Sequence, residues 1–117
     1  MLQQYTMAIA VSSGGAATVY FGSNIRGRVH AIQYVVGTLD VGTDIVLTGE
    51  TTGVAILTDS PAASEWFYPR ALPNKATDGA AGSVPTEAIH VLNERIKLVV
   101  AQGGTSTAGS MTIFVDE

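Results

Sequence analysis

The stretch Tyr5-Thr6-Met7-Ala8-Ile9-Ala10-Val11-Ser12 places large apolar side chains at every second position, with small or polar ones between them. Successive side chains of a β-strand point to opposite faces, so this pattern predicts a strand with one buried face. After the turn at Gly14-Gly15, residues 16–21 predict a second strand. The two strands could form an N-terminal hairpin, or residues 1–24 could form an extended arm.

Short strand-like runs separated by turn residues continue along the rest of the chain. Residues 25–36, 45–47 and 54–57 have apolar side chains on both parities. Such a pattern predicts a strand central to a sandwich, or one whose outer face packs on another subunit. Pro69 and Pro73 favour an edge strand before them, because proline cannot donate a hydrogen bond to a ladder. Further strands are predicted at residues 88–92, 96–100 and 111–115, and residues 75–85 predict a long surface loop.

These runs predict an all-β fold, because about eight short strands at near-regular spacing without a helical pattern are typical of a sandwich or barrel. We expect a single domain over residues 1–117, an antiparallel β-sandwich with jelly-roll or Greek-key-like connections. The chain has no cysteine, and its 117 residues are enough for a core that needs no disulfide or metal.

Charge is scarce in this sequence. Charged residues make up 14% of the chain, against about a quarter in a typical soluble domain. This shortage predicts that part of the surface is covered by a partner. The net charge of -4 and the scattered cations argue against nucleic-acid binding. Every apolar run is too short to span a membrane or to serve as the core of a secretion signal, so we expect neither.

The sequence offers no recognisable constellation for catalysis. Its only histidines, His30 and His90, lie inside strand runs, and no nucleophile elbow is present. Asp40 and Asp44 share one turn, where aspartate beside glycine and threonine usually caps the turn itself. The glycine pairs precede no helix, so they cannot cradle a phosphate. We therefore expect no catalytic residue, no cofactor and no metal site.

Three consecutive aromatics, Trp66-Phe67-Tyr68, are the strongest candidate contact residues. On a strand, Trp66 and Tyr68 would share one face with Arg70, and Phe67 would take the other. Trp, Tyr and Arg are frequent interface hot spots. Alternatively, all three aromatics fill the core, or Trp66 and Tyr68 form a sugar-stacking platform. The other predicted interface candidates are Arg26, Arg28, Tyr5 and Met7.

Four runs resemble small structural proteins of tailed bacteriophages, similar to capsid decoration or cement proteins. The resemblance covers most of the chain after Ile25, and the runs are residues 27–34 (GRVHAIQY), 47–58 (LTGETTGVAILT), 66–70 (WFYPR) and 94–104 (ERIKLVVAQGG). Proteins of this kind are small β-sandwiches that sit on the outer capsid at symmetry axes, often as trimers.

The resemblance implies a non-enzymatic virion protein, made in the bacterial host cytoplasm, that binds the major capsid protein on the capsid exterior. It would stabilise the shell by bridging capsid subunits, and it would self-associate, with a homotrimer favoured. A tail, neck or fibre-base component is the alternative within the virion. A carbohydrate-binding module that uses Trp66 and Tyr68 is the alternative from another class. Residues 1–24 could add a strand to a neighbouring subunit.

Overall fold

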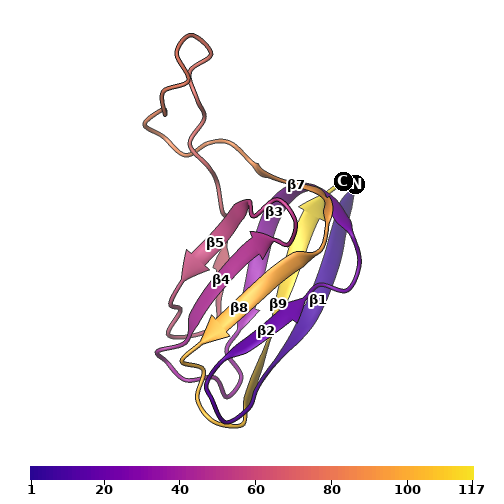
Figure 1. Ribbon diagram of the computed structural model, residues 1–117, viewed down its shortest axis with the longest axis vertical. Coiled ribbons are helices and arrows are strands. Elements are labelled where there is room, and N and C mark those ends of the chain that lie inside the picture. Colours follow the sequence, from indigo (N-terminus) through magenta and orange to yellow (C-terminus); the bar gives the residue numbers. More distant parts are fainter.

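The computed structural model describes residues 1–117 and contains nine β-strands in two antiparallel sheets, with no helix (Figure 1). It therefore has no helix that could cross a membrane. The strands are β1 (Leu2–Val11), β2 (Ala17–Tyr20), β3 (Ile25–Val35), β4 (Asp44–Gly49), β5 (Ala55–Asp59), β6 (Glu65–Phe67), β7 (Ile89–Glu94), β8 (Ile96–Ala101) and β9 (Thr107–Asp116).

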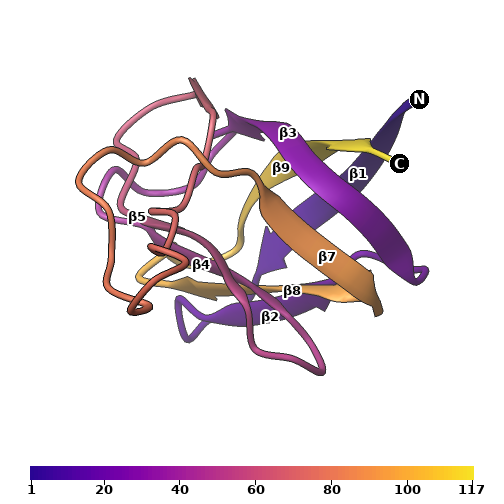
Figure 2. The same ribbon diagram turned by 90° about the horizontal axis from the view of Figure 1, so that it is seen from above.

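The strands pair as nested hairpins. β4 pairs with β5 at the centre, and around them β3 pairs with β7, β2 with β8, and β1 with β9. The five-stranded sheet has the order β1-β9-β3-β6, with β7 also beside β3, and the four-stranded sheet has the order β2-β8-β4-β5. Figure 2 shows the two sheets as separate layers. This is the strand order of a jelly roll, so the predicted antiparallel β-sandwich is confirmed, with β6 as a short extra strand.

The expected N-terminal hairpin or arm is wrong. β1 pairs along its whole length with β9, whereas β2 pairs with β8 in the opposite sheet. Both strands thus belong to the body of the sandwich. The partners of β1 and β2 come from the last third of the chain, and the local turn at Gly14-Gly15 does not reveal such distant pairing.

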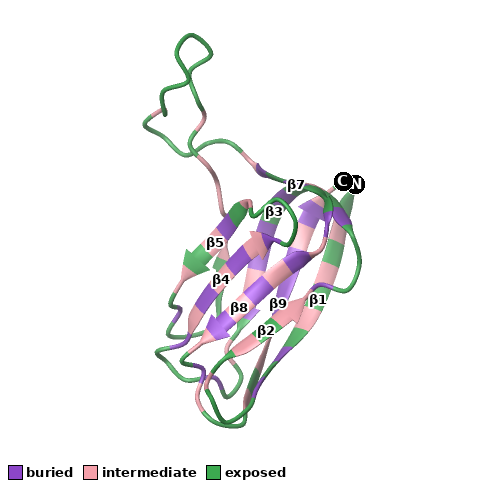
Figure 3. Cartoon of the chain, in the orientation of Figure 1, coloured by how far each residue is buried: buried purple, intermediate pink, exposed green.

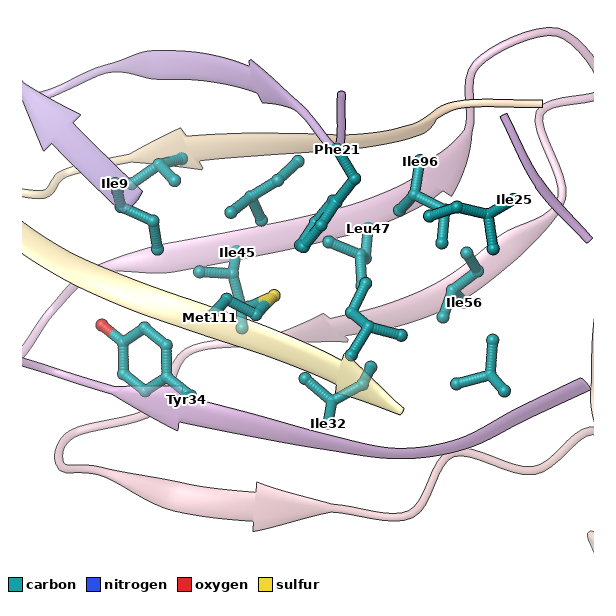
Figure 4. Close-up of a cluster of buried hydrophobic side chains, with 14 of the residues drawn as sticks. Ile9, Phe21, Ile25, Ile32, Tyr34, Ile45, Leu47, Ile56, Ile96 and Met111 are labelled. Carbon is teal, nitrogen blue, oxygen red and sulfur yellow. The ribbon is translucent and has the colours of Figure 1, made fainter. Parts of the chain in front are cut away.

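The core lies between the sheets and consists of aliphatic and aromatic side chains from the inner faces (Figure 4). Buried and exposed residues alternate along most strands, as the banding in Figure 3 shows. The largest fully buried side chains include Tyr34, Phe21, Ile9, Ile25, Ile32, Ile45, Leu47, Ile96, Leu98 and Met111. This alternation is the period-two pattern that the sequence predicts.

A β-bulge explains why β3 is apolar on both parities. The register of β3 against β9 shifts between Val29 and Ala31, so His30 is the extra residue. The bulge reverses the parity, and Val29, Ile32 and Tyr34 all become buried. β3 is indeed a central strand, as one of the two predicted alternatives requires. Its two-sided apolar pattern therefore gives no evidence for a covered outer face.

A similar irregularity lies in β5, where the register against β4 shifts opposite Leu47 and Thr48. Ile56 is buried and the next residue, Leu57, also packs against the core. In β4, by contrast, Val46 does lie on the outer face of the four-stranded sheet, opposite Val99 of β8.

A buried carboxylate fixes the corner where the chain passes from β7 to β8. Glu94 is 4% exposed, and its Oε1 accepts hydrogen bonds from the backbone N–H groups of Thr51 (2.6 Å) and Thr52 (2.9 Å). The Thr52 hydroxyl donates to Oε2 at 2.6 Å. These bonds, led by that of the Thr52 hydroxyl, hold the pKa of Glu94 below its usual range. Next to it, Arg95 binds both carboxylate oxygens of Glu50 and lies over the Tyr20 ring.

Residues 68–88 form a long loop that projects from the sandwich (Figure 1). Most of its side chains are exposed, as expected from the sequence for residues 75–85. Its tip is a small hairpin of its own, with backbone hydrogen bonds from Lys75 to Ala80 and from Gly82 to Pro73. The loop accounts for much of the elongation of the molecule, which measures 50 × 28 × 23 Å.

Candidate interaction surface

The outer face of the five-stranded sheet carries no charge over most of its area. We use "outer face" below for the outward side chains of β1, β9, β3 and β6 in register with one another. They are Leu2, Gln4, Thr6, Ala8 and Ala10; Ala108, Ser110, Thr112 and Phe114; Ala31, Gln33 and Val35; and Trp66, with the charged pair Arg28 and Asp116 in register with Leu2 at one end. Over most of this face the side chains are therefore small, polar and uncharged, or apolar.

Trp66 is the largest side chain on the outer face. It is 48% exposed and lies directly across from Gln33 of β3. Its ring stacks on Phe114 with the centroids 5.5 Å apart and the planes inclined by 27°. Ala31, the cross-strand neighbour of Phe114, is only 4% exposed although it points outward. The aromatic pair is therefore held in place by the sheet, which reduces the entropy that Trp66 would lose on contact with a partner.

A small depression beside Trp66 is lined by Gln33, Tyr34, Ser64 and Glu65, and its volume is about 130 Å³. The amide of Gln33 is a hydrogen-bonding group on the same face as the exposed aromatic ring, whereas Glu65, the cross-strand neighbour of Tyr34, lines the depression from the other parity of β6. In the sequence, Glu65 is the only polar residue next to Trp66. The proximity of Gln33 could not be seen there, because it arises from the pairing of β3 with β6.

Basic side chains gather at the β3–β7 end of the same sheet. Arg28 and His90 are cross-strand neighbours, and Arg26 lies opposite Leu92. Arg28, His30 and Arg70 line one shallow depression together with Asp116. Three of the six basic residues and both histidines of the chain therefore lie in one region, although they are scattered in the sequence.

The basic region is partly neutralised by Asp116, which Arg28 shares with the N-terminal ammonium group. Arg28 Nη2 lies 3.1 Å from Asp116 Oδ2, and the N-terminal ammonium lies 3.3 Å from Asp116 Oδ1. The ammonium group first, and Arg28 second, hold the pKa of Asp116 below its usual range. Arg70 Nη1 donates to the backbone carbonyls of Pro69 (2.7 Å) and His30 (3.3 Å), and neither Arg70 nor Arg26 forms an ion pair.

Three other predicted interface residues, Tyr68, Tyr5 and Met7, do not lie on the outer face. β6 ends at Phe67, so Tyr68 lies outside the strand at the start of the projecting loop, 63% exposed. The expectation that Trp66 and Tyr68 share a strand face is therefore wrong. The strand ends early because the following Pro69 has no N–H to donate.

Tyr5 and Met7 lie on the inner parity of β1 and are half-buried against the edge of the core. The Tyr5 hydroxyl donates to Glu117 Oε1 at 3.4 Å. Burial, and secondly the Glu117 carboxylate, raise the pKa of Tyr5. These residues belong to the edge of the sheet rather than to its outer face.

Sequence reasoning missed Phe114, which completes the aromatic pair. A signal was present, because Met111, Ile113 and Val115 share one parity and Thr112 and Phe114 share the other. The structure places the first three in the core and Phe114 on the outer face.

No group of three or more histidine or acidic side chains in residues 1–117 is placed to hold a metal ion. The largest depression lies at the end of the sandwich away from the chain termini, among the loops that contain residues 13–15, 39–42 and 102–105 (Figure 1). It is lined mostly by glycines and small polar residues. A comparison with models of known protein families finds no match, and a comparison with curated proteins finds none either.

Proposed function

We propose that this protein is a non-enzymatic structural component of a phage virion, which binds the outside of the assembled capsid and stabilises it by bridging capsid subunits. The observation that carries the proposal is the outer face, uncharged except at its Arg28–Asp116 end, with its ordered Trp66–Phe114 pair. A weakly charged surface with an aromatic anchor is suited to packing against another protein. The resemblance of the sequence runs to decoration proteins supplies the identity of that partner, the major capsid protein.

The proposal has a simple thermodynamic basis. A protein that binds only the assembled shell stabilises the shell by linkage, because disassembly requires its release. Each bridging copy also makes two or more weak contacts act together. A jelly roll is a common architecture for virion proteins, although fold alone does not establish function.

Capsid binding can be tested with purified protein and assembled capsids that lack it, from the phage that carries the gene. Wild-type protein is expected to co-sediment with the capsids and to raise their disruption temperature. Gln33→Arg, which puts a charge at the centre of the outer face, is expected to weaken binding at least tenfold. Thr58→Arg is the control, because Thr58 is exposed on the outer side of the four-stranded sheet. No binding by the wild type, or equal binding by the two variants, would contradict the proposal.

A tail, neck or fibre-base position is the alternative within the virion, since the same surface would serve there. Immunogold labelling of intact virions separates these locations: label on the head supports the proposal, and label on the tail supports the alternative.

The depression beside Trp66 favours carbohydrate binding as a second candidate function. The aromatic ring offers a stacking surface, with the hydrogen-bonding amide of Gln33 directly across from it and Glu65 at the margin of the depression. A glycan array with wild-type protein and Trp66→Ala tests it. Binding that is lost in the variant supports a carbohydrate site, and an array without wild-type binding removes it.

A further inference from the structure

β1 is an unprotected edge strand. It is ten residues long, contains no charged residue, proline or glycine, and pairs with β9 without a register shift. Natural sheet edges are usually shortened, charged, interrupted by proline or bulged, because a free edge accepts another strand. The other edges of this sandwich are shorter: β2 has four residues, β5 five, β6 three and β7 six.

The hydrogen bonds at the chain ends show which backbone groups of β1 are free. Met1 and Glu117 exchange both of their backbone hydrogen bonds, at 2.8 and 3.0 Å. In an antiparallel ladder, hydrogen-bonded pairs alternate with non-hydrogen-bonded ones. The odd-numbered residues of β1 therefore face β9, and the even-numbered residues, Leu2, Gln4, Thr6, Ala8 and Ala10, direct their N–H and C=O groups to the open edge.

We propose that two copies of this chain associate through β1, antiparallel about a two-fold axis at Thr6. Only this register brings all five outward-directed residues of both copies into hydrogen-bonded pairs. Leu2 then lies opposite Ala10 of the second copy, Gln4 opposite Ala8, and Thr6 opposite Thr6. The two five-stranded sheets become one continuous sheet across the dimer, an isologous contact of the kind that closes by symmetry.

The side chains of β1 are self-complementary in this register. On the inner parity, Tyr5 lies opposite Met7 of the second copy, and the two contacts are repeated across the axis. Both side chains are only half-buried in the single chain, although they adjoin the core. Aromatic rings and methionine sulfur pack favourably, so association covers the exposed edges of both. On the outer parity no charged groups meet. The second copy is thus the occupant that matches this edge, whatever the outer face binds.

Disulfide trapping tests the axis directly, because the chain has no native cysteine. In a hydrogen-bonded pair, the two Thr6 Cα atoms would be about 5.5 Å apart, within reach of a disulfide. The two Ala10 Cα atoms would be about 27 Å apart, at roughly 3.4 Å per residue. Under mild oxidation, Thr6→Cys is expected to run mainly as a cross-linked dimer on a non-reducing gel, and Ala10→Cys as a monomer. Equal cross-linking of the two variants, or none in either, would overturn the proposal.

Sedimentation velocity supplies a second test without cysteine. Wild type is expected to dimerise, and Thr6→Lys and Thr6→Glu are each expected to weaken dimerisation at least tenfold, because like charges meet on the axis. An equimolar mixture of the two variants is expected to dimerise again. Thr18→Lys, on the exposed side of β2, is the control and should behave as wild type. A monomeric wild type would refute the β1 contact. A wild-type trimer, as the resemblance implies, that is unaffected by Thr6→Lys would refute it too.

Discussion

Replacing Glu94 by glutamine perturbs the corner between β7 and β8 while it keeps the shape of the side chain. Oε1 keeps the backbone donors of Thr51 and Thr52, and the new amide group can donate to the Thr52 hydroxyl. Three charge-assisted hydrogen bonds become neutral ones, which costs roughly 1 kcal/mol each. A neutral amide costs less free energy to bury than a carboxylate, and this difference offsets part of the loss. We expect the free energy of unfolding to fall by about 2 kcal/mol at pH 7.

The effect depends on pH in a defined direction. The pKa of Glu94 is lowered in the folded protein, so its contribution to stability is complete above the unfolded pKa of about 4.3 and is lost as the pH falls below it. The difference between wild type and Glu94→Gln should therefore shrink between about pH 5 and pH 3. Glu50 and Asp116, whose pKa values are also lowered, titrate in both proteins and cancel in the comparison.

Urea unfolding followed by the fluorescence of Trp66, the only tryptophan, measures both quantities. Glu87→Gln is the control, because Glu87 is an exposed carboxylate on the projecting loop. A loss below about 0.5 kcal/mol, or a difference that is the same at pH 3 and pH 7, would refute this account of the corner.

Three further stability changes follow from the structure. Tyr34→Phe should be neutral or stabilise by up to about 1 kcal/mol, because the buried Tyr34 hydroxyl makes no hydrogen bond of acceptable geometry and the neighbouring Thr43 hydroxyl donates to the Asp40 carbonyl instead. A loss above about 1 kcal/mol in urea unfolding would mean that the hydroxyls of Tyr34 and Thr43 are hydrogen-bonded. Gly37→Ala should cost at least about 2 kcal/mol more than Gly53→Ala. Both glycines have positive φ, but only at Gly37 would a Cβ clash with a backbone oxygen, that of Ala108. Equal losses by thermal unfolding would contradict this. Replacing residues 74–81, the tip of the projecting loop, by a short turn should leave the midpoint of thermal unfolding within about 3 °C of wild type, because the tip forms its own hydrogen bonds. A larger drop would show that the tip supports the core.

Local patterns in the sequence predict the strands well and their pairing poorly. The alternation in Tyr5 to Val11 identifies β1, and Pro69 correctly marks β6 as an edge strand. The pairing of β1 with β9 joins residues about a hundred positions apart, and no local signal specifies it. The bulge at His30 is likewise set by the pairing of β3 with β9, so a strict period of two misassigns the faces of that strand.

The candidate surface was predictable only in part, for the same reason. Four of the predicted interface residues lie on or beside the five-stranded sheet, namely Trp66, Arg70, Arg26 and Arg28. Their grouping with Phe114, Gln33 and the histidines depends on β3 lying between β9 and β6. The scarcity of charged residues, by contrast, is visible in the sequence. The structure shows that one weakly charged surface is the outer face of the five-stranded sheet.

A density map of the intact virion tests the central proposal most directly. We expect a jelly-roll density on the outside of the capsid shell, with the outer face of β1, β9, β3 and β6 turned toward the capsid subunits and Trp66 buried at the contact. Density for this protein at the tail, or on the capsid with the outer face and Trp66 turned to solvent, would contradict it.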